Sequence, residues 1–135
     1  MNLVRLIYAS RFCHQIYDSQ ELSKINNSAQ KNNKAADITG MLVISDDYFL
    51  QCLEGDRVAV SQIFNKISLD QRHDSIVLLS LEHVIQREFA DWEMKFVILT
   101  KANSNLIREF STSTQFNPFT MHFQNALGLM KALRK

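Results

Sequence analysis

The stretch that decides the fold is Tyr48-Phe49-Leu50-Gln51-Cys52-Leu53. Apart from Gln51 it is apolar on both alternating faces, which predicts a strand buried on both sides. Gln51 shares its face with Phe49 and Leu53. A buried amide without partners costs about 1–3 kcal/mol for each unmet group. Gln51 must therefore meet a water, another side chain or a polar ligand.

The first predicted strand, residues 3–10, carries a similar feature. Tyr8 and Ser10 are in phase with the apolar residues of this strand, so a phenol and a hydroxyl are expected to point into the same interior. Tyrosine beside glutamine in a core usually serves only to satisfy both groups. The alternative is that Tyr8 and Gln51 form a hydrogen-bonded pair that shares a third, polar partner.

Length and composition favour one soluble globular domain, because the chain has 135 residues, 46% hydrophobic and 21% charged. A net charge of +1 argues against electrostatic binding of nucleic acid. We find no apolar run that could span a bilayer and no secretory leader. Cys13 and Cys52 lack metal-ligand spacing, so we expect no metal site and a reduced, cytoplasmic protein without membrane attachment.

Strand and helix patterns alternate along the chain. Asp18 and Glu21 predict a capping box that opens a helix running to about Asn32, and Asp56 is expected to cap a second helix. Further strands are predicted at residues 39–44, 48–53, 75–84 and 91–99. This βαββαββ order is typical of a ferredoxin-like α+β fold, in which a five-stranded mixed sheet carries two helices on one face.

The C-terminal residues supply a cover for the other face of the sheet. Residues 104–110 predict a short helix, and a second helix is predicted from Pro118 to about Leu133. Its apolar positions share one helical face, namely Phe119, Phe123, Ala126, Leu127, Met130 and Leu133. We therefore expect a main domain over residues 1–100 and a C-terminal helical cap over residues 101–135.

Two clusters have both an ordinary and a functional interpretation. Asn32 and Asn33 follow the first helix, where asparagines are ordinarily cap or loop residues. Their amides also match the donors and acceptors of a heterocycle. Lys66 and Asp70 lie one turn apart, which by default predicts a solvent-side ion pair of little energetic value. With Arg72 and His73 close behind, the alternative is a basic rim of a pocket that suits a phosphate.

The last predicted strand carries Trp92, Met94 and Phe96 on one face. Such stripes are usually plain core. No phosphate-cradling glycine loop, nucleophile elbow or zinc-protease motif is visible in the sequence, so no catalytic residues are expected.

Six blocks of sequence, taken together, closely resemble the BLUF domains, which are blue-light sensors that use FAD. The blocks match in order and spacing over residues 2–99, and the tail resembles the variable helical cap of short BLUF proteins. The blocks are Leu6-Ile7-Tyr8-Ala9-Ser10, Asn32-Asn33, Ile38-Thr39-Gly40-Met41-Leu42, Phe49-Leu50-Gln51-Cys52-Leu53-Glu54-Gly55, Asp70-Gln71-Arg72-His73 and Phe89-Ala90-Asp91-Trp92-Glu93-Met94.

The resemblance implies an isoalloxazine ring between the two helices, over one face of the sheet. Tyr8 is then the donor of an electron and a proton to the excited flavin, and Gln51 is the switch whose amide rearranges. Lys66 and Asp70 match positions near the ribityl-phosphate arm, although arginine is common at the lysine position. The flavin-binding residues that the resemblance implies are Tyr8, Ser10, Ile25, Asn32, Asn33, Gln51, Lys66, Ile67, Asp70, His73, Trp92 and Met94.

Trp92 and Met94 match a pair that passes the light signal on, and the sequence leaves open which of them faces the flavin. The expected cofactor is FAD, or FMN or riboflavin in an overexpressed protein. The resemblance favours a stand-alone photoreceptor that is not an enzyme and that acts through a downstream protein or as a homo-oligomer. The alternative is a flavin-free interaction or ligand-binding module of the same fold. An acylphosphatase-like hydrolase is disfavoured, because the arginine-bearing anion loop after the first strand is not evident.

Overall fold

The structure is a computed structural model of the 135-residue chain, and it describes residues 1–12, 19–70, 73–92, 94–113 and 115–134. Side chains at 12, 19–22 and 26 are also left out of the description. The predictions that rest on Cys13, on the Asp18–Glu21 capping box and on Arg72 lie outside the described residues and side chains.

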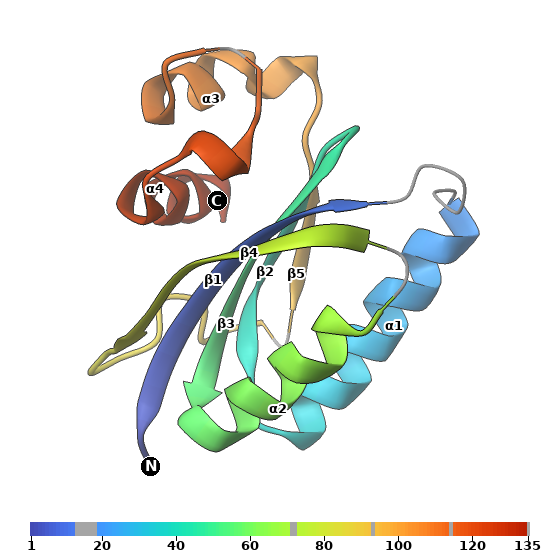
Figure 1. Cartoon of the computed structure of the whole chain (residues 1–135), viewed down its shortest axis with the longest axis vertical. Helices are drawn as coiled ribbons and strands as arrows, with labels where there is room; N and C mark the ends of the chain where they lie inside the picture. The colour runs from blue at the N-terminus through green and yellow to red at the C-terminus, as the bar shows by residue number, and fades with distance from the viewer. Residues whose placement is uncertain (13–18, 71–72, 93, 114, 135) are drawn as a thin grey trace.

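In the described part of the chain, five strands form one sheet with helices on both faces (Figure 1). The strand order is β4-β1-β3-β2-β5, and every neighbouring pair is antiparallel except β2 and β5. The predicted ferredoxin-like α+β fold is confirmed. The strands are β1 (Leu3–Phe12), β2 (Thr39–Ile44), β3 (Tyr48–Asp56), β4 (His73–His83) and β5 (Lys95–Ile98).

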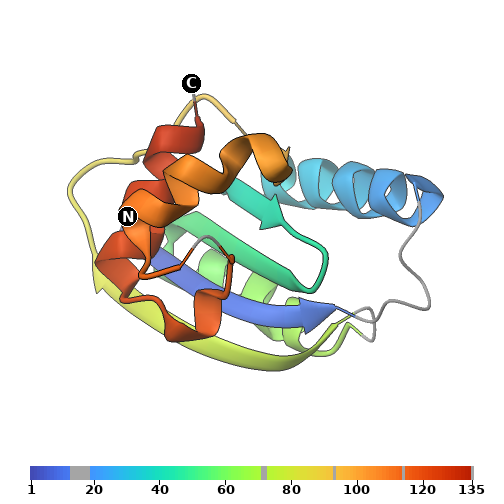
Figure 2. The ribbon, with the colours of Figure 1, turned by 90° about the horizontal axis from the view of Figure 1, so that it is seen from above.

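The helices divide between the two faces as the sequence predicted. Helices α1 (Ser19–Ala35) and α2 (Arg57–Ser68) cover one face, and α3 (Ser104–Phe110) and α4 (Phe123–Leu133) lie on the other. Figure 2 shows α3 and α4 in front of the sheet with α2 behind it. Short 3-10 turns precede the two cap helices, η2 (Lys101–Asn103) and η3 (Pro118–Thr120). None of the described helices has the length and apolarity that a membrane crossing requires.

Strand β3 lies in the middle of the sheet, which explains its burial on both sides. Phe49 and Leu53 belong to the core under α1 and α2, whereas Leu50 and Cys52 belong to the core under the cap. The prediction of a strand buried on both faces is therefore confirmed. Gln51 lies between Phe49 and Leu53 in this alternation and so belongs to the α1/α2 face.

Two local features follow directly from residue chemistry. Asp56 caps α2, because its carboxylate accepts a hydrogen bond from the backbone N–H of Val58 at 3.2 Å, as predicted. Gly40 is needed in β2, since a Cβ at this position would lie 1.9 Å from the carbonyl oxygen of Cys52. Any side chain there would push β2 away from β3.

The last strand is shorter than predicted, and its start corrects one expectation. β5 begins at Lys95, so Trp92 and Met94 precede it. A turn at residues 89–92, closed by a 3.2 Å hydrogen bond from Trp92 N–H to the Phe89 carbonyl, interrupts the extended backbone. Strict alternation of faces requires an extended chain, so the predicted common face of Trp92, Met94 and Phe96 is wrong. Met94 and Phe96 lie in the core under α1 and α2, and Trp92 packs in the core under the cap.

The cap buries an apolar face on the sheet. Ala126 and Met130 of the predicted face are fully buried, and Leu127 and Leu133 are partly buried. Phe119 lies in η3, because α4 begins only at Phe123, where the His122 ring nitrogen accepts from the Gln124 N–H. The cap core also contains Met121 and Leu129, which the predicted face did not include.

Candidate functional site

A pocket of about 170 Å³ lies between α1 and α2, over the sheet. Nine residues that the sequence proposed for flavin binding line it together. They come from both helices, from β1 and β3 and from the start of β4, which are far apart in sequence. The nine are Tyr8, Ile25, Asn32, Asn33, Gln51, Lys66, Ile67, Asp70 and His73.

The pocket floor contains the Tyr8–Gln51 pair. The two residues lie directly opposite each other in the antiparallel register of β1 and β3, and the Tyr8 hydroxyl donates a hydrogen bond to Gln51 Oε1. Gln51 Nε2 donates in turn to Met94 Sδ at 3.4 Å. A thioether is only a weak acceptor. The amide is therefore held firmly on its oxygen side and weakly on its nitrogen side.

Tyr8 is set up to remain a neutral phenol. Burial raises the pKa of Tyr8 well above its ordinary value of 10, and the nearby Asp70 carboxylate raises it further. Its ring packs against Phe64, with ring centroids 5.5 Å apart, and meets the edge of His73 at 6.3 Å. These contacts fix the direction of the hydroxyl toward Gln51 and keep its proton in place across the ordinary pH range.

His73 is held between the sheet and the end of α2. Its Nε2 lies 2.6 Å from the carbonyl oxygen of Ile67, which can only accept, so Nε2 carries a proton. Its Nδ1 lies 2.9 Å from the hydroxyl of Ser10. Ser10 is fully buried and does not line the pocket, so its described role is to orient His73.

The polar rim differs in detail from the sequence prediction. Asn33 is buried, with 2% of its surface exposed, whereas Asn32 is exposed. Lys66 lies in the last turn of α2, but the helix ends at Ser68, so Asp70 lies beyond it and not one turn along the same helix. Both side chains nevertheless line the pocket, one from the helix and one from the turn that follows.

Met94 and Trp92 lie outside the pocket wall and on different faces of the sheet. Met94 contacts the Gln51 amide nitrogen without lining the pocket. Trp92 packs in the core under the cap, with Lys95 Nζ 4.5 Å from its ring centroid. Of the pair that the sequence left open, Met94 is the residue on the Gln51 side.

Five pocket residues escaped the sequence analysis, and all have small or apolar side chains. The signal was present for some of them, since Ser28 and Ala29 follow Ile25 by three and four residues on the same helical face. The strand residues Leu42 and Phe49 face the same side of the sheet as Tyr8 and Gln51. The five are Ser28, Ala29, Leu42, Phe49 and Ile63.

Residues 3–95 match the family described as sensors of blue-light using FAD. The chain belongs to the BLUF family. It is 32% identical over 95 residues to the photoactivated adenylate cyclase subunit beta of Euglena longa, covering 70% of this chain and 11% of that protein. It is 34% identical over 90 residues to the blue light- and temperature-regulated antirepressor BluF of Escherichia coli strain K12, covering 64% of this chain and 21% of that protein.

This BLUF chain thus spans only a small part of both curated relatives, each of which is much longer. Among solved structures, it resembles BlsA in its photo-activated state with a TM-score of 0.89 and 33% identity, covering 97% of this chain and 94% of that one. The BlsA ground state gives a TM-score of 0.86 at 32% identity, with 96% and 87% covered. The BlsA similarity therefore extends through the cap.

The pocket fits the flavin that BLUF proteins bind. A flavin ring is flat and apolar on its faces and polar along one edge. The amides of Asn33 and Gln51 supply donors and acceptors for such an edge, while Ile25, Leu42 and Ile63 supply apolar cover.

Proposed function

We propose that this chain binds FAD in the pocket between α1 and α2 and senses blue light through a rearrangement of the Gln51 amide. The observation that carries the proposal is the hydrogen-bond chain from Tyr8 through Gln51 to Met94 at the floor of a BLUF pocket. A tyrosine–glutamine pair that only satisfied its own hydrogen bonds in the core would not require an adjacent pocket. Here they line one, together with the buried Asn33.

Asn33 and Gln51 would hold the polar edge of the ring, and Ile25 would cover its face. Lys66, exposed at the rim, suits the phosphate arm as a point charge, which makes this contact weaker than an arginine fork. When bound, the flavin supplies the absorption of blue light and an excited state that accepts an electron and a proton. Tyr8 holds the removable proton on Oη, directed at Gln51 Oε1.

The Gln51 amide has two possible arrangements, because its rotation exchanges Oε1 and Nε2. In the present arrangement the oxygen accepts from Tyr8 and the nitrogen donates to Met94. After rotation the oxygen would face the Met94 sulfur, which cannot donate, and that contact would be lost. Light only needs to shift this equilibrium by a few kcal/mol to change the dominant state.

Output is proposed to pass to a downstream protein or to a second copy of the chain. Residues 1–100 would form the flavin-binding domain and residues 101–135 the cap that responds to it. The supporting feature is the position of the cap, which packs on the sheet face opposite the pocket through Ala126, Leu129 and Met130. A change at the sheet can therefore reach the cap through directly packed residues.

An absorption spectrum of the purified protein tests flavin binding and switching together. The protein should be yellow, and blue light should shift the flavin band reversibly to longer wavelength by a small amount. Mass spectrometry of the released flavin would separate FAD from FMN and riboflavin. A colourless protein that cannot be reconstituted with FAD would favour the flavin-free interaction module instead.

Tyr8→Phe and Gln51→Leu test the assigned roles. Both variants should fold and bind flavin, and both should lose the light-induced shift, because one lacks the phenolic proton and the other lacks the amide. Tyr48→Phe is the matched control, since Tyr48 lies outside the pocket against Phe116 and Phe119. A full photocycle in either pocket variant would contradict the role proposed for that residue.

Asn33→Ala tests binding without switching. Loss of a buried partner for the ring edge should weaken FAD binding by about 1–3 kcal/mol in calorimetry. Asn27→Ala, an exposed substitution on the same helix, controls for the change in helix propensity. Equal FAD affinity in the two variants would reduce Asn33 to a helix-end residue.

A further inference from the structure

Helix α1 ends in a Schellman motif that lacks the usual glycine. The Asp37 N–H donates to the Lys34 carbonyl at 3.2 Å. The Ile38 N–H donates to the Asn33 carbonyl at 2.8 Å, which completes the pair of hydrogen bonds that defines this motif. The left-handed position of the motif is usually glycine, but here it is Asp37, with a φ of 54°. A left-handed backbone costs energy for any residue with a side chain, although aspartate tolerates it better than most.

The side chain of Arg87 holds this turn from outside the helix. Its Nη2 donates to the Asp37 carbonyl at 2.9 Å and lies 3.4 Å from the Asp37 carboxylate. Its Nη1 donates to Thr39 Oγ1 at 3.0 Å and to the Glu54 carbonyl at 3.1 Å. One guanidinium therefore joins the turn after α1 to the first residue of β2 and to the end of β3. We call these four contacts the Arg87 bridge.

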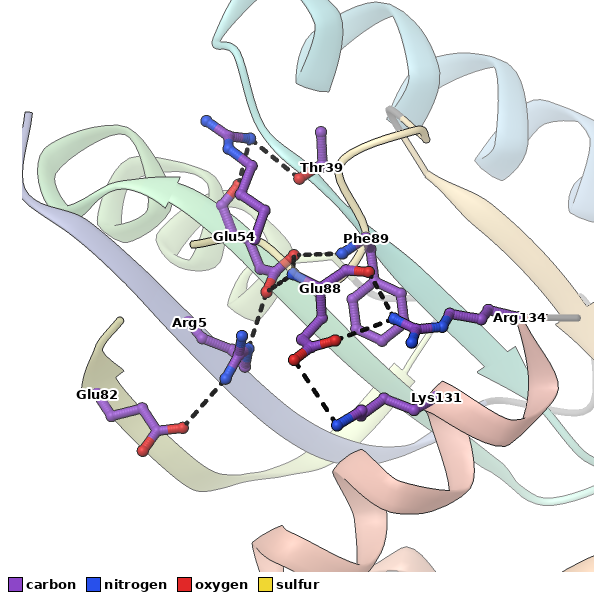
Figure 3. A network of polar contacts seen from close by, with 9 residues as sticks. Arg5, Thr39, Glu54, Glu82, Glu88, Phe89, Lys131 and Arg134 are labelled. Carbon is purple, nitrogen blue, oxygen red and sulfur yellow. Dashed lines mark hydrogen bonds and ion pairs between the residues drawn. The ribbon is translucent and has the colours of Figure 1, made fainter. Parts of the chain in front are cut away.

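The backbone that carries Arg87 is itself fixed to the sheet. Figure 3 shows that the buried Glu54 carboxylate accepts hydrogen bonds from the Glu88 N–H at 2.9 and 3.0 Å and from the Phe89 N–H at 2.8 Å. The same carboxylate accepts from Arg5 Nε at 2.8 Å. Hydrogen bonds to a charged group are the strong ones. The guanidinium therefore reaches the turn from a fixed point, and its side chain is only 15% exposed.

The Arg87 bridge acts mainly on the backbone of the turn. The Asp37 side chain is 77% exposed, and ion pairs in such a position contribute little. The hydrogen bond to the Asp37 carbonyl is shorter and charge-assisted. This carbonyl also fits closely against β3, since a Cβ on Gly55 would lie 3.2 Å from its oxygen and 3.1 Å from Ile38 Cγ1. The guanidinium thus holds a carbonyl that the neighbouring strand leaves little room to move.

The turn in turn fixes a residue of the pocket wall. Asn33 lines the pocket with 2% of its surface exposed, and it lies in the last turn of α1, which ends at Ala35. Its carbonyl accepts the Ile38 N–H only while Asp37 keeps its left-handed backbone. A turn that relaxed would lose this hydrogen bond and free the end of the helix. The Arg87 bridge therefore lies two hydrogen bonds away from the pocket wall.

We propose that Arg87 is a positioning residue that holds Asp37 in its left-handed conformation and thereby fixes the Asn33 amide at the pocket. Arg87 does not line the pocket itself, so it acts only through the end of α1. The proposal rests on the proposed function in one respect, namely that Asn33 holds the polar edge of a flavin. The geometry of the turn is a property of the chain with or without flavin.

Amide hydrogen exchange at Ile38 in the purified full chain tests the effect on the turn. Arg87→Gln removes the bridge, and Arg87→Lys keeps the charge without the planar fork. Both should lower the protection factor of the Ile38 N–H by about threefold to thirtyfold. Adding Asp37→Gly to Arg87→Gln should restore most of the protection, because glycine adopts the left-handed backbone without penalty. Arg134→Gln is the matched control, since this arginine also binds a carbonyl and a carboxylate but on the cap side, and it should leave Ile38 unchanged.

FAD titration of the same variants tests the effect on the pocket. Arg87→Gln should weaken FAD binding by about threefold to tenfold, and Asp37→Gly should restore most of the affinity. In the Asn33→Ala background, Arg87→Gln should have no further effect, because the amide that it positions is absent. A general loss of stability would instead weaken binding equally in both backgrounds.

The outcomes separate this proposal from the proposed function. Unchanged Ile38 protection in both Arg87 variants, or no recovery with Asp37→Gly, would overturn the role of Arg87. Equal weakening of FAD binding with and without the Asn33 amide would also overturn it, while flavin binding itself would stand. A protein that binds no flavin overturns the proposed function, and Ile38 protection still decides whether Arg87 fixes the end of α1.

Discussion

Strand β3 places one buried polar residue on each face of the sheet, and the two are treated differently. Glu54, on the cap face, accepts from Arg5 and from the backbone N–H groups of Glu88 and Phe89. Gln51, on the α1/α2 face, accepts from Tyr8 and donates only to the weak acceptor Met94. Both are nearly inaccessible to solvent, with 0% and 4% exposure.

The hydrogen bonds fix the Glu54 carboxylate in one position, whereas those of the Gln51 amide allow it to rotate. A buried carboxylate with strong donors cannot lose them without a large cost. A neutral amide can rotate at smaller cost, because its nitrogen gives up only the weak contact with Met94 and can then donate to the Tyr8 hydroxyl, which accepts as well as donates. One strand therefore carries a fixed point on one face and a proposed switch on the other.

The largest effect is expected for Glu54→Ala. Arg5 and two backbone donors would lose a buried acceptor, which should lower the free energy of unfolding by about 3–5 kcal/mol. Urea unfolding measures the loss, and Gln51→Leu serves as the comparison on the opposite face, with a smaller loss of about 1–3 kcal/mol from the Tyr8 hydroxyl left without its acceptor. Equal losses in the two variants would break the contrast between the faces.

The next effect concerns the close contact between β2 and β3 that supports both faces. Gly40→Ala places a Cβ within 1.9 Å of the Cys52 carbonyl oxygen, which belongs to rigid backbone. The strands must separate, so the free energy of unfolding should fall by about 1–3 kcal/mol or more. Thermal unfolding measures it. Stability equal to that of the parent protein would show that β2 can move without cost.

A smaller effect is expected when the switch is removed as a pair. Tyr8→Phe alone leaves Gln51 Oε1 without its donor and should cost about 1–3 kcal/mol. Tyr8→Phe/Gln51→Leu removes both groups and should restore most of that stability, because apolar replacement of both partners is nearly neutral. A double variant less stable than either single variant in urea unfolding would mean that the pair holds the core together.

The smallest effect is expected at the ion pairs of Glu88 with Lys131 and Arg134, and it depends on pH. The Arg134 hydrogen bond holds the pKa of Glu88 below its ordinary value of 4.5; partial burial opposes this, while the charges of Lys131, Arg134 and Arg5 add to it. A carboxyl whose pKa is lowered by folding stabilises above the unfolded value and loses that contribution as pH falls through the folded value. Glu88→Gln should therefore cost about 0.2–1 kcal/mol at pH 7 and less at acidic pH.

Urea unfolding of Glu88→Gln and of the parent protein at pH 7 and below pH 4.5 measures this difference. Glu109→Gln, on α3, controls for loss of an exposed carboxylate. A cost that stays constant as the pH falls would mean that Glu88 acts through its backbone and not through its charge.

The alternation and spacing of apolar residues along the chain were sufficient to predict much of the candidate site. The period of two in β3 placed Gln51 with Phe49 and Leu53, and the same period placed Tyr8 inward on β1. Because the two strands pair, side chains facing the same way must meet. The chemistry of single residues similarly predicted the Asp56 cap of α2.

The tertiary structure alone decided which of Trp92 and Met94 meets Gln51. The turn at residues 89–92 breaks the alternation, and its position depends on how the chain approaches β2 for parallel pairing. It also decided the partners of Glu54, since the backbone N–H groups that it binds carry no signature in sequence. The hydrogen bond from Arg134 to the Glu88 carboxylate joins residues 46 positions apart, and it exists only because the cap docks on the sheet. Local patterns determined the faces of single strands, whereas contacts between distant segments depended on the packing of the whole chain.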